Sequence, residues 1–62
     1  MNGFIEVTEQ IDGLRVLVPL HRIIDIVETD EGVLLETGID KKGEPTGFFA
    51  RESFDEIKNQ MR

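Results

Sequence analysis

The sequence predicts an α+β domain, in which a five-stranded antiparallel β-meander built from three hairpins is followed by one C-terminal helix. Short runs that alternate apolar and polar residues are separated by turns that end in glycine, which is the pattern of consecutive hairpins. After residue 52 the apolar spacing changes from two residues to three or four, the spacing of a helix. No linker or repeat interrupts residues 1–62, so we expect a single domain.

The first hairpin joins residues 4–9 to residues 14–18 through a turn that contains Asp12-Gly13. Asp-Gly is a strong hairpin signal because glycine accepts the positive φ that such turns require. The register that follows sets two apolar pairs on one face: Val7 opposite Val16, and Ile5 opposite Val18. Pro19 ends the return strand, since proline cannot donate to a ladder.

A short helical turn over residues 20–22 leads into the central hairpin, residues 23–37, around which the other strands are arranged. Its turn, residues 29–32, ends in Gly32, which supplies the positive φ. The predicted pairs are Ile26 opposite Leu35 and Val27 opposite Leu34.

A third hairpin turns at residues 40–43, and its closing strand spans residues 47–51. Ser53 and Glu56 fit a capping box at the start of the C-terminal helix. Phe54, Ile57 and Met61 form one apolar stripe on this helix. A helix this short is not stable alone in water, so we expect it to pack on the sheet.

These registers give the sheet two partly apolar faces. The face expected beneath the helix carries Ile5, Val7, Val16, Val18, Ile24, Ile26, Leu35 and Phe48. The opposite face carries Glu6, Arg15, Asp25 and Glu36, together with the apolar Leu17, Ile23, Val27, Leu34 and Phe49. A meander with one solvated face should be polar there. Either the sheet curls into a partial barrel or a bulge moves some of these side chains inward, or the five apolar residues form a contact surface.

The small size of the chain favours the contact surface. A 62-residue domain buries only about 60% of the surface that its unfolded chain exposes, and such domains are commonly stabilised by a disulfide, a metal or a partner. There is no cysteine and only one histidine, His21, so we expect no disulfide, no metal and no cofactor. We therefore expect a homo-oligomer, in the first place a dimer, in contact through Leu17, Ile23, Val27, Leu34 and Phe49.

The formal net charge of −6 disfavours nucleic acid and anionic lipid as partners. No run reaches the roughly 18 apolar residues of a membrane span, and residues 1–6 lack the features of an export signal, so we expect a cytoplasmic protein. The acidic residues lie mostly on turns and outer strand positions, and Ser53 is explained by helix capping. No catalytic constellation is apparent, and we do not expect an enzyme.

Residues 4–7, 16–19, 23–28 and 33–38, followed by the closing segment 50–57, resemble the small FlbD/SwrD-type proteins of bacterial flagellar operons. The resemblance covers nearly the whole chain, and residues 50–57 are similar to that family's Val-x-Glu-Ser-x-x-Glu-Ile ending. It implies a non-enzymatic role in motility and provides no catalytic residues.

Residues 18–24 and 51–56 also resemble the strand entry and the capped helix of LytTR-type DNA-binding domains. This second resemblance implies, as the alternative function, a nucleic-acid-binding regulatory module that would use Arg15, Arg22, Lys41 and Lys42. Phosphate-driven binding falls steeply with ionic strength, so salt-dependent binding of duplex DNA distinguishes the two functions.

Overall fold

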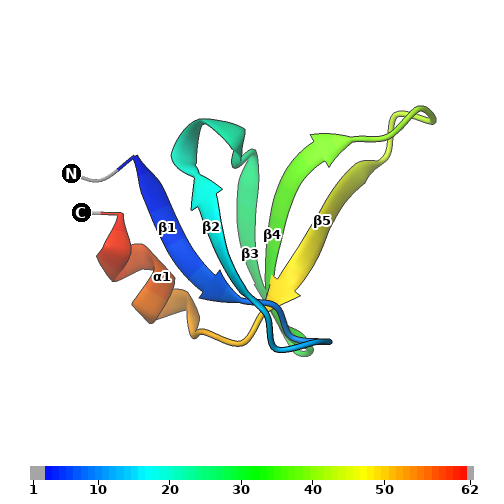
Figure 1. Cartoon of the computed structure of the whole chain (residues 1–62). Coiled ribbons are helices and arrows are strands. Elements are labelled where there is room, and N and C mark those ends of the chain that lie inside the picture. Colours follow the sequence, from blue (N-terminus) through cyan, green and yellow to red (C-terminus); the bar gives the residue numbers. More distant parts are fainter. Residues whose placement is uncertain (1–2, 62) are drawn as a thin grey trace.

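The computed structural model describes residues 3–61 and confirms an α+β fold of antiparallel sheet and one C-terminal helix (Figure 1). In chain order the elements are β1 (Phe4–Thr8), β2 (Arg15–Pro19), the 3₁₀ turn η1 (Leu20–Arg22), β3 (Asp25–Thr29), β4 (Gly32–Ile39), β5 (Pro45–Ala50) and α1 (Phe54–Gln60). All three predicted hairpins are present, as the pairs β1–β2, β3–β4 and β4–β5.

The predicted registers of the first two hairpins are confirmed. In the first, Val7 pairs with Val16 and Ile5 with Val18. In the second, Ile26 pairs with Leu35, Val27 with Leu34, and Asp25 with Glu36. The β4–β5 ladder shifts by one residue between Glu36 and Gly38, which makes Thr37 a bulge.

The five strands do not form the single continuous meander that the sequence suggests. Among residues 3–61, β1 and β2 form one sheet and β3, β4 and β5 form another, because η1 separates β2 from β3. The two sheets meet where β1 and β5 end, at a bridge between Glu9 and Ala50. Two backbone hydrogen bonds flank it, from Gln10 N–H to the Phe49 carbonyl and from Arg51 N–H to the Thr8 carbonyl, both 2.9 Å. Backbone pairing therefore connects the strands in the order β2-β1-β5-β4-β3, with β1 and β5 in contact only at this junction. Figure 1 shows the strands converging there.

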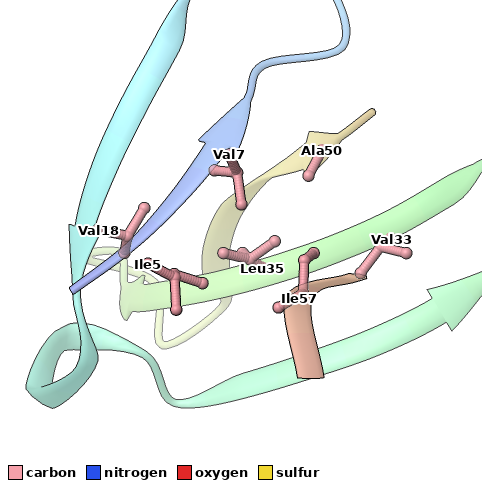
Figure 2. Close-up of a cluster of buried hydrophobic side chains, with 7 residues drawn as sticks. All are labelled: Ile5, Val7, Val18, Val33, Leu35, Ala50 and Ile57. Carbon is pink, nitrogen blue, oxygen red and sulfur yellow. The ribbon is translucent and has the colours of Figure 1, made fainter. Parts of the chain in front are cut away.

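The hydrophobic core lies between the two sheets and α1. Figure 2 shows its side chains pointing toward one another from four strands and the helix. The buried residues are Ile5, Val7, Val18, Val33, Leu35, Ala50 and Ile57. Val16, Ile26 and Phe48 pack against this cluster as partly buried residues, in agreement with the predicted core face.

The predicted orientations of Ile23 and Ile24 are wrong. Ile23 packs against the core, whereas the side chain of Ile24 is 62% exposed. The cause is η1: the Ile23 N–H donates to the Leu20 carbonyl at 3.1 Å, so Ile23 caps the 3₁₀ turn and β3 begins only at Asp25. The strand alternation seen at Ile26 therefore cannot be extended back to Ile24.

The helix α1 begins with the predicted capping box. Ser53 Oγ accepts from the Glu56 N–H at 3.1 Å, and Glu56 Oε1 accepts from the Ser53 N–H at 2.9 Å. The helix lies beside β1 and contributes Ile57 to the core, while Phe54 packs at its edge (Figure 1). Across residues 3–61, no helix has the length and hydrophobicity needed to cross a membrane.

Candidate interaction face

Three predicted contact residues form one line across the β3–β4–β5 sheet. Leu34 on β4 pairs with Val27 on β3 and with Phe49 on β5, so the three side chains are direct cross-strand neighbours. We call Val27, Leu34 and Phe49 the apolar row. Cross-strand neighbours on one face are in contact distance, so the row is one continuous apolar strip.

The apolar row faces away from the core. Residues alternate between the two faces of a strand, and the neighbours of Leu34 on β4, Val33 and Leu35, are both buried in the core. Val27 is 37% exposed, and Leu34 and Phe49 are partly exposed. None of the three belongs to the buried cluster or to the side chains that pack against it. The fold therefore does not bury this row in its own core, as a sheet curled into a partial barrel would.

Gly32 and Gln10 lie beside the row, on the side of the β3–β4 turn. Gly32 has a φ of 138°, and the Phe49 ring lies 3.6 Å from the position that a Cβ on Gly32 would take. Gln10, from the β1–β2 connection, donates from Nε2 to the Glu31 carbonyl at 2.7 Å. This contact ties the β3–β4 turn to the first hairpin and fixes the surroundings of Phe49.

Acidic residues lie on both sides of the row along the strands. On one side Asp25 and Glu36 oppose each other directly, which forms an acidic rim beside Val27 and Leu34. On the other side Thr29 pairs with Gly32, and its hydroxyl donates to the Gly32 carbonyl at 2.7 Å and accepts from the Glu31 N–H at 3.1 Å. The turn between these two residues carries two further exposed acids, Asp30 and Glu31.

The two remaining predicted contact residues lie apart from the row. Leu17 is 65% exposed on the β1–β2 sheet, opposite Glu6. Ile23 packs against the core and so does not share a surface with Val27. The structure thus brings together three of the five predicted residues, and an interface hypothesis now rests on Val27, Leu34 and Phe49.

The outer face of β1–β2 carries a shallow depression of about 270 Å³, lined by Glu6, Arg15, Val16 and Leu17. Arg15 forms an ion pair with Glu6 across the two strands. Exposed pairs of this kind contribute about 0–1 kcal/mol to stability. In the described part of the chain no polar side-chain atom is buried without a partner, and no cluster of three or more His, Cys, Asp or Glu side chains could hold a metal.

Two side chains from residues 52–60 bind the backbone of β1, and neither was among the residues expected to have a role. Glu52 accepts from the Thr8 N–H at 2.7 Å and from the Thr8 hydroxyl at 2.8 Å. Gln60 accepts from the Glu6 N–H at 2.8 Å and donates to the Glu6 carbonyl at 2.9 Å. Contacts between residues 44 and 54 positions apart leave no local pattern, so no periodicity could have predicted them.

The surroundings of Glu52 shift the pKa of its carboxyl. Its partial burial alone would raise the pKa of the carboxyl. The hydrogen bonds from the Thr8 amide and hydroxyl, with a smaller contribution from the Arg51 charge, outweigh burial and lower the pKa below its ordinary value. Glu52 is thus held as a carboxylate against β1.

The four basic residues of the nucleic-acid hypothesis occupy three separate elements. Arg15 is at the start of β2, Arg22 is in η1, and Lys41 and Lys42 are in the β4–β5 turn. Arg15 is paired with Glu6, which lowers its availability for a phosphate. His21 is exposed on η1.

Comparison of the chain with protein-family models, with curated proteins and with solved structures finds no match.

Proposed function

We propose that this chain is a small, cytoplasmic, non-enzymatic protein-interaction module that self-associates through the apolar row. The observation that carries the proposal is the direct cross-strand alignment of Val27, Leu34 and Phe49 on the face opposite the core. Apolar surface that continues over three strands is unfavourable in water and is typical of interfaces.

A second copy of the chain is the partner that the small size of the domain favours. Self-association adds buried area to a domain in which the core of residues 3–61 has seven buried side chains. In a two-fold arrangement with the strands of the two copies antiparallel, the two Asp25–Glu36 rims lie on opposite sides of the interface and do not face each other. Each rim then faces the turn of the other copy that carries Asp30 and Glu31, so the apolar row, and not charge, drives the contact.

The test is the mass of the protein in solution when the row is made charged. We expect the wild-type chain to sediment as a dimer at micromolar concentration and a Val27→Glu, Leu34→Glu variant to sediment as a monomer. Both side chains lie outside the core, so the variant should keep the circular dichroism spectrum of the wild type.

A matched control places two glutamates elsewhere on the same sheet. Ile24 is 62% exposed just before β3, and Ile39 is 65% exposed at the end of β4, so Ile24→Glu, Ile39→Glu adds the same charge outside the row. The control should remain a dimer. A folded row variant whose mass equals that of the wild type would show that the row is not the interface.

The similarity of the strand and helix pattern to FlbD/SwrD-type proteins supports an accessory role in motility for this module. A strain that lacks the protein should then swim poorly, and the Val27→Glu, Leu34→Glu variant should fail to restore swimming. Normal swimming of the deletion strain would remove motility from the proposal and leave the interaction face to be tested by mass alone.

Nucleic-acid binding is the alternative function, and its test does not depend on the oligomeric state of the protein. Binding through Arg15, Arg22, Lys41 and Lys42 would appear as a duplex DNA shift that weakens steeply as salt is raised. With the basic residues on three elements and a net charge of −6, we expect no shift even at low salt.

A further inference from the structure

Beyond its junction with β5 at Glu9, one edge of β1 is covered by residues 51–60 instead of a strand. Along β1, Ile5 and Val7 direct their backbone groups toward β2, and Glu6 and Thr8 direct theirs the other way. Gln60 binds both backbone groups of Glu6, with distances of 2.8 and 2.9 Å. The amide of Gln60 thus makes the two hydrogen bonds that a neighbouring strand would make.

Thr8 is covered in the same way by the segment that leads into the helix. Its N–H donates to Glu52 at 2.7 Å, and its carbonyl accepts from the Arg51 N–H at 2.9 Å. The segment from Arg51 to Gln60 therefore occupies the outward edge of β1 at two successive outward-facing residues (Figure 1).

The helical part of the cover is short. The helix α1 has seven residues, and Ile57 is its only buried residue. Helices of this length are unstable without tertiary contacts, and elements with few buried apolar contacts open at a lower free energy than the whole domain. Opening of α1 would expose the outward backbone groups of Glu6. Those of Thr8 would follow once the opening extended through Glu52 to Arg51, beside the Glu9–Ala50 bridge. The exposed groups would form a free strand edge, which readily pairs with another strand.

We propose that the segment from Arg51 to Gln60 is a cover of the β1 edge that can be released. Its release allows β1 to pair with β1 of a second copy. Antiparallel pairing about Val7 sets Glu6 of each copy opposite Thr8 of the other. Each such pair exchanges both N–H···O bonds, and no two glutamates are placed opposite each other. The edge is therefore complementary to itself. This contact is separate from the apolar row and does not depend on it.

The first test is amide hydrogen exchange by NMR on the full chain. In Gln60→Ala, we expect the Glu6 and Thr8 amides to exchange about five- to tenfold faster, the effect of losing hydrogen bonds worth about 1 kcal/mol. Thr8 makes no hydrogen bond to Gln60, so its acceleration reports release of the whole segment. Asn59→Ala, an exposed change on the same helix, should leave both amides unchanged. Faster exchange of the Glu6 amide alone would overturn the proposal that the segment is released as a unit.

The second test is the mass of Gln60→Ala combined with Val27→Glu, which removes the apolar row as a contact. We expect a dimer that forms as concentration rises, together with renewed protection of the Glu6 and Thr8 amides. A monomer at every concentration, or a dimer without this protection, would overturn pairing through β1. Because Val27→Glu disables the row, this outcome is independent of whether the proposed function holds.

A blocking variant completes the test. Proline at position 6 removes a backbone donor that faces away from β2, together with the exposed Glu6–Arg15 ion pair, so Glu6→Pro should leave the backbone ladder between β1 and β2 intact. Added to the previous variant, it should abolish the dimer. If the variant with Glu6→Pro does not fold, the Gln60→Ala, Val27→Glu variant still tests β1 pairing. In that variant the protection of the Thr8 amide should increase with protein concentration.

Discussion

Thr8 and Glu52 are joined twice: the Thr8 N–H donates to Oε1 at 2.7 Å and its hydroxyl donates to Oε2 at 2.8 Å. These bonds lower the pKa of Glu52 against the opposing effect of burial. A lowered folded-state pKa means that the contact stabilises the fold above the ordinary glutamate pKa and that this stability is lost as pH falls through the folded-state value.

We therefore predict that Glu52→Gln lowers the free energy of unfolding by about 1 kcal/mol near neutral pH, because a charged acceptor is replaced by a neutral one. The difference from wild type should shrink as pH falls below the ordinary glutamate pKa. Urea unfolding at a series of pH values measures this. Glu28→Gln, at an exposed position on β3, is the control and should follow the wild-type profile. A difference for Glu52→Gln that is constant with pH would contradict the assignment.

Gly47 is predicted to be irreplaceable, because it leaves no room for a side chain. A Cβ at this position would overlap the Leu35 carbonyl, lying 2.8 Å from its carbon and 2.9 Å from Glu36 Cα. Backbone atoms cannot move aside without breaking the β4–β5 ladder, so Gly47→Ala should cost about 1–3 kcal/mol or more. A domain of 62 residues has about 3–9 kcal/mol in total, so the loss should be visible in a thermal melt.

Gly3→Ala is the matched control, since a Cβ there has no atom within 4 Å. Its melting temperature should equal that of the wild type. Equal melting temperatures for the two variants would mean that β5 lies farther from β4 than this packing requires.

Ile23 and Ile24 should respond differently to the same change. Ile23 packs on the core, so Ile23→Ala should lower the free energy of unfolding by about 1–3 kcal/mol, less than a fully buried isoleucine. Ile24 is 62% exposed, so Ile24→Ala should change it by less than about 0.5 kcal/mol. Urea unfolding of the two variants measures both values. A larger loss for Ile24→Ala than for Ile23→Ala would mean that Ile24 faces the core, as strand alternation predicts.

The sequence was sufficient to predict the local structure of the chain. The register that pairs Ile5 with Val18 follows from alternation together with a turn of known length, because a slip of one residue would move every apolar side chain to the wrong face. The capping box of Ser53 and Glu56 is likewise local. The apolar row follows from the same registers, so all three of its residues could be predicted.

What the sequence could not predict depends on contacts between distant segments. The meeting of β1 with β5 at Glu9 and Ala50 has no local signal, and it replaces the continuous sheet that adjacent hairpins suggest. The cover of the β1 edge by Glu52 and Gln60 joins residues 44 and 54 positions apart. Two other failures were local. Val33 could have been assigned to the core, since it lies two residues before Leu35 on β4. The orientation of Ile23 could not be predicted from strand alternation, because the 3₁₀ turn that Ile23 caps interrupts that alternation.

The acidic pair Asp25 and Glu36 gives the last prediction. Like charges directly opposite on a sheet destabilise it, and an opposite-charge pair contributes about 0.2–1 kcal/mol in the favourable direction. Asp25→Lys should therefore raise the free energy of unfolding, and Asp25→Lys with Glu36→Lys should lose that gain because like charges again face each other. The double-mutant cycle isolates the pair from the effect of each single change.

The cycle should be measured by urea unfolding at a protein concentration below that at which the chain begins to associate. Association would stabilise the folded chain by mass action. Repeating it in 1 M salt supplies the control, since exposed charges are screened there over about 3 Å and the coupling should fall toward zero. A coupling that persists in high salt would mean that the two side chains interact by packing rather than by charge. The acidic rim would then be no electrostatic obstacle to the association of two acidic copies.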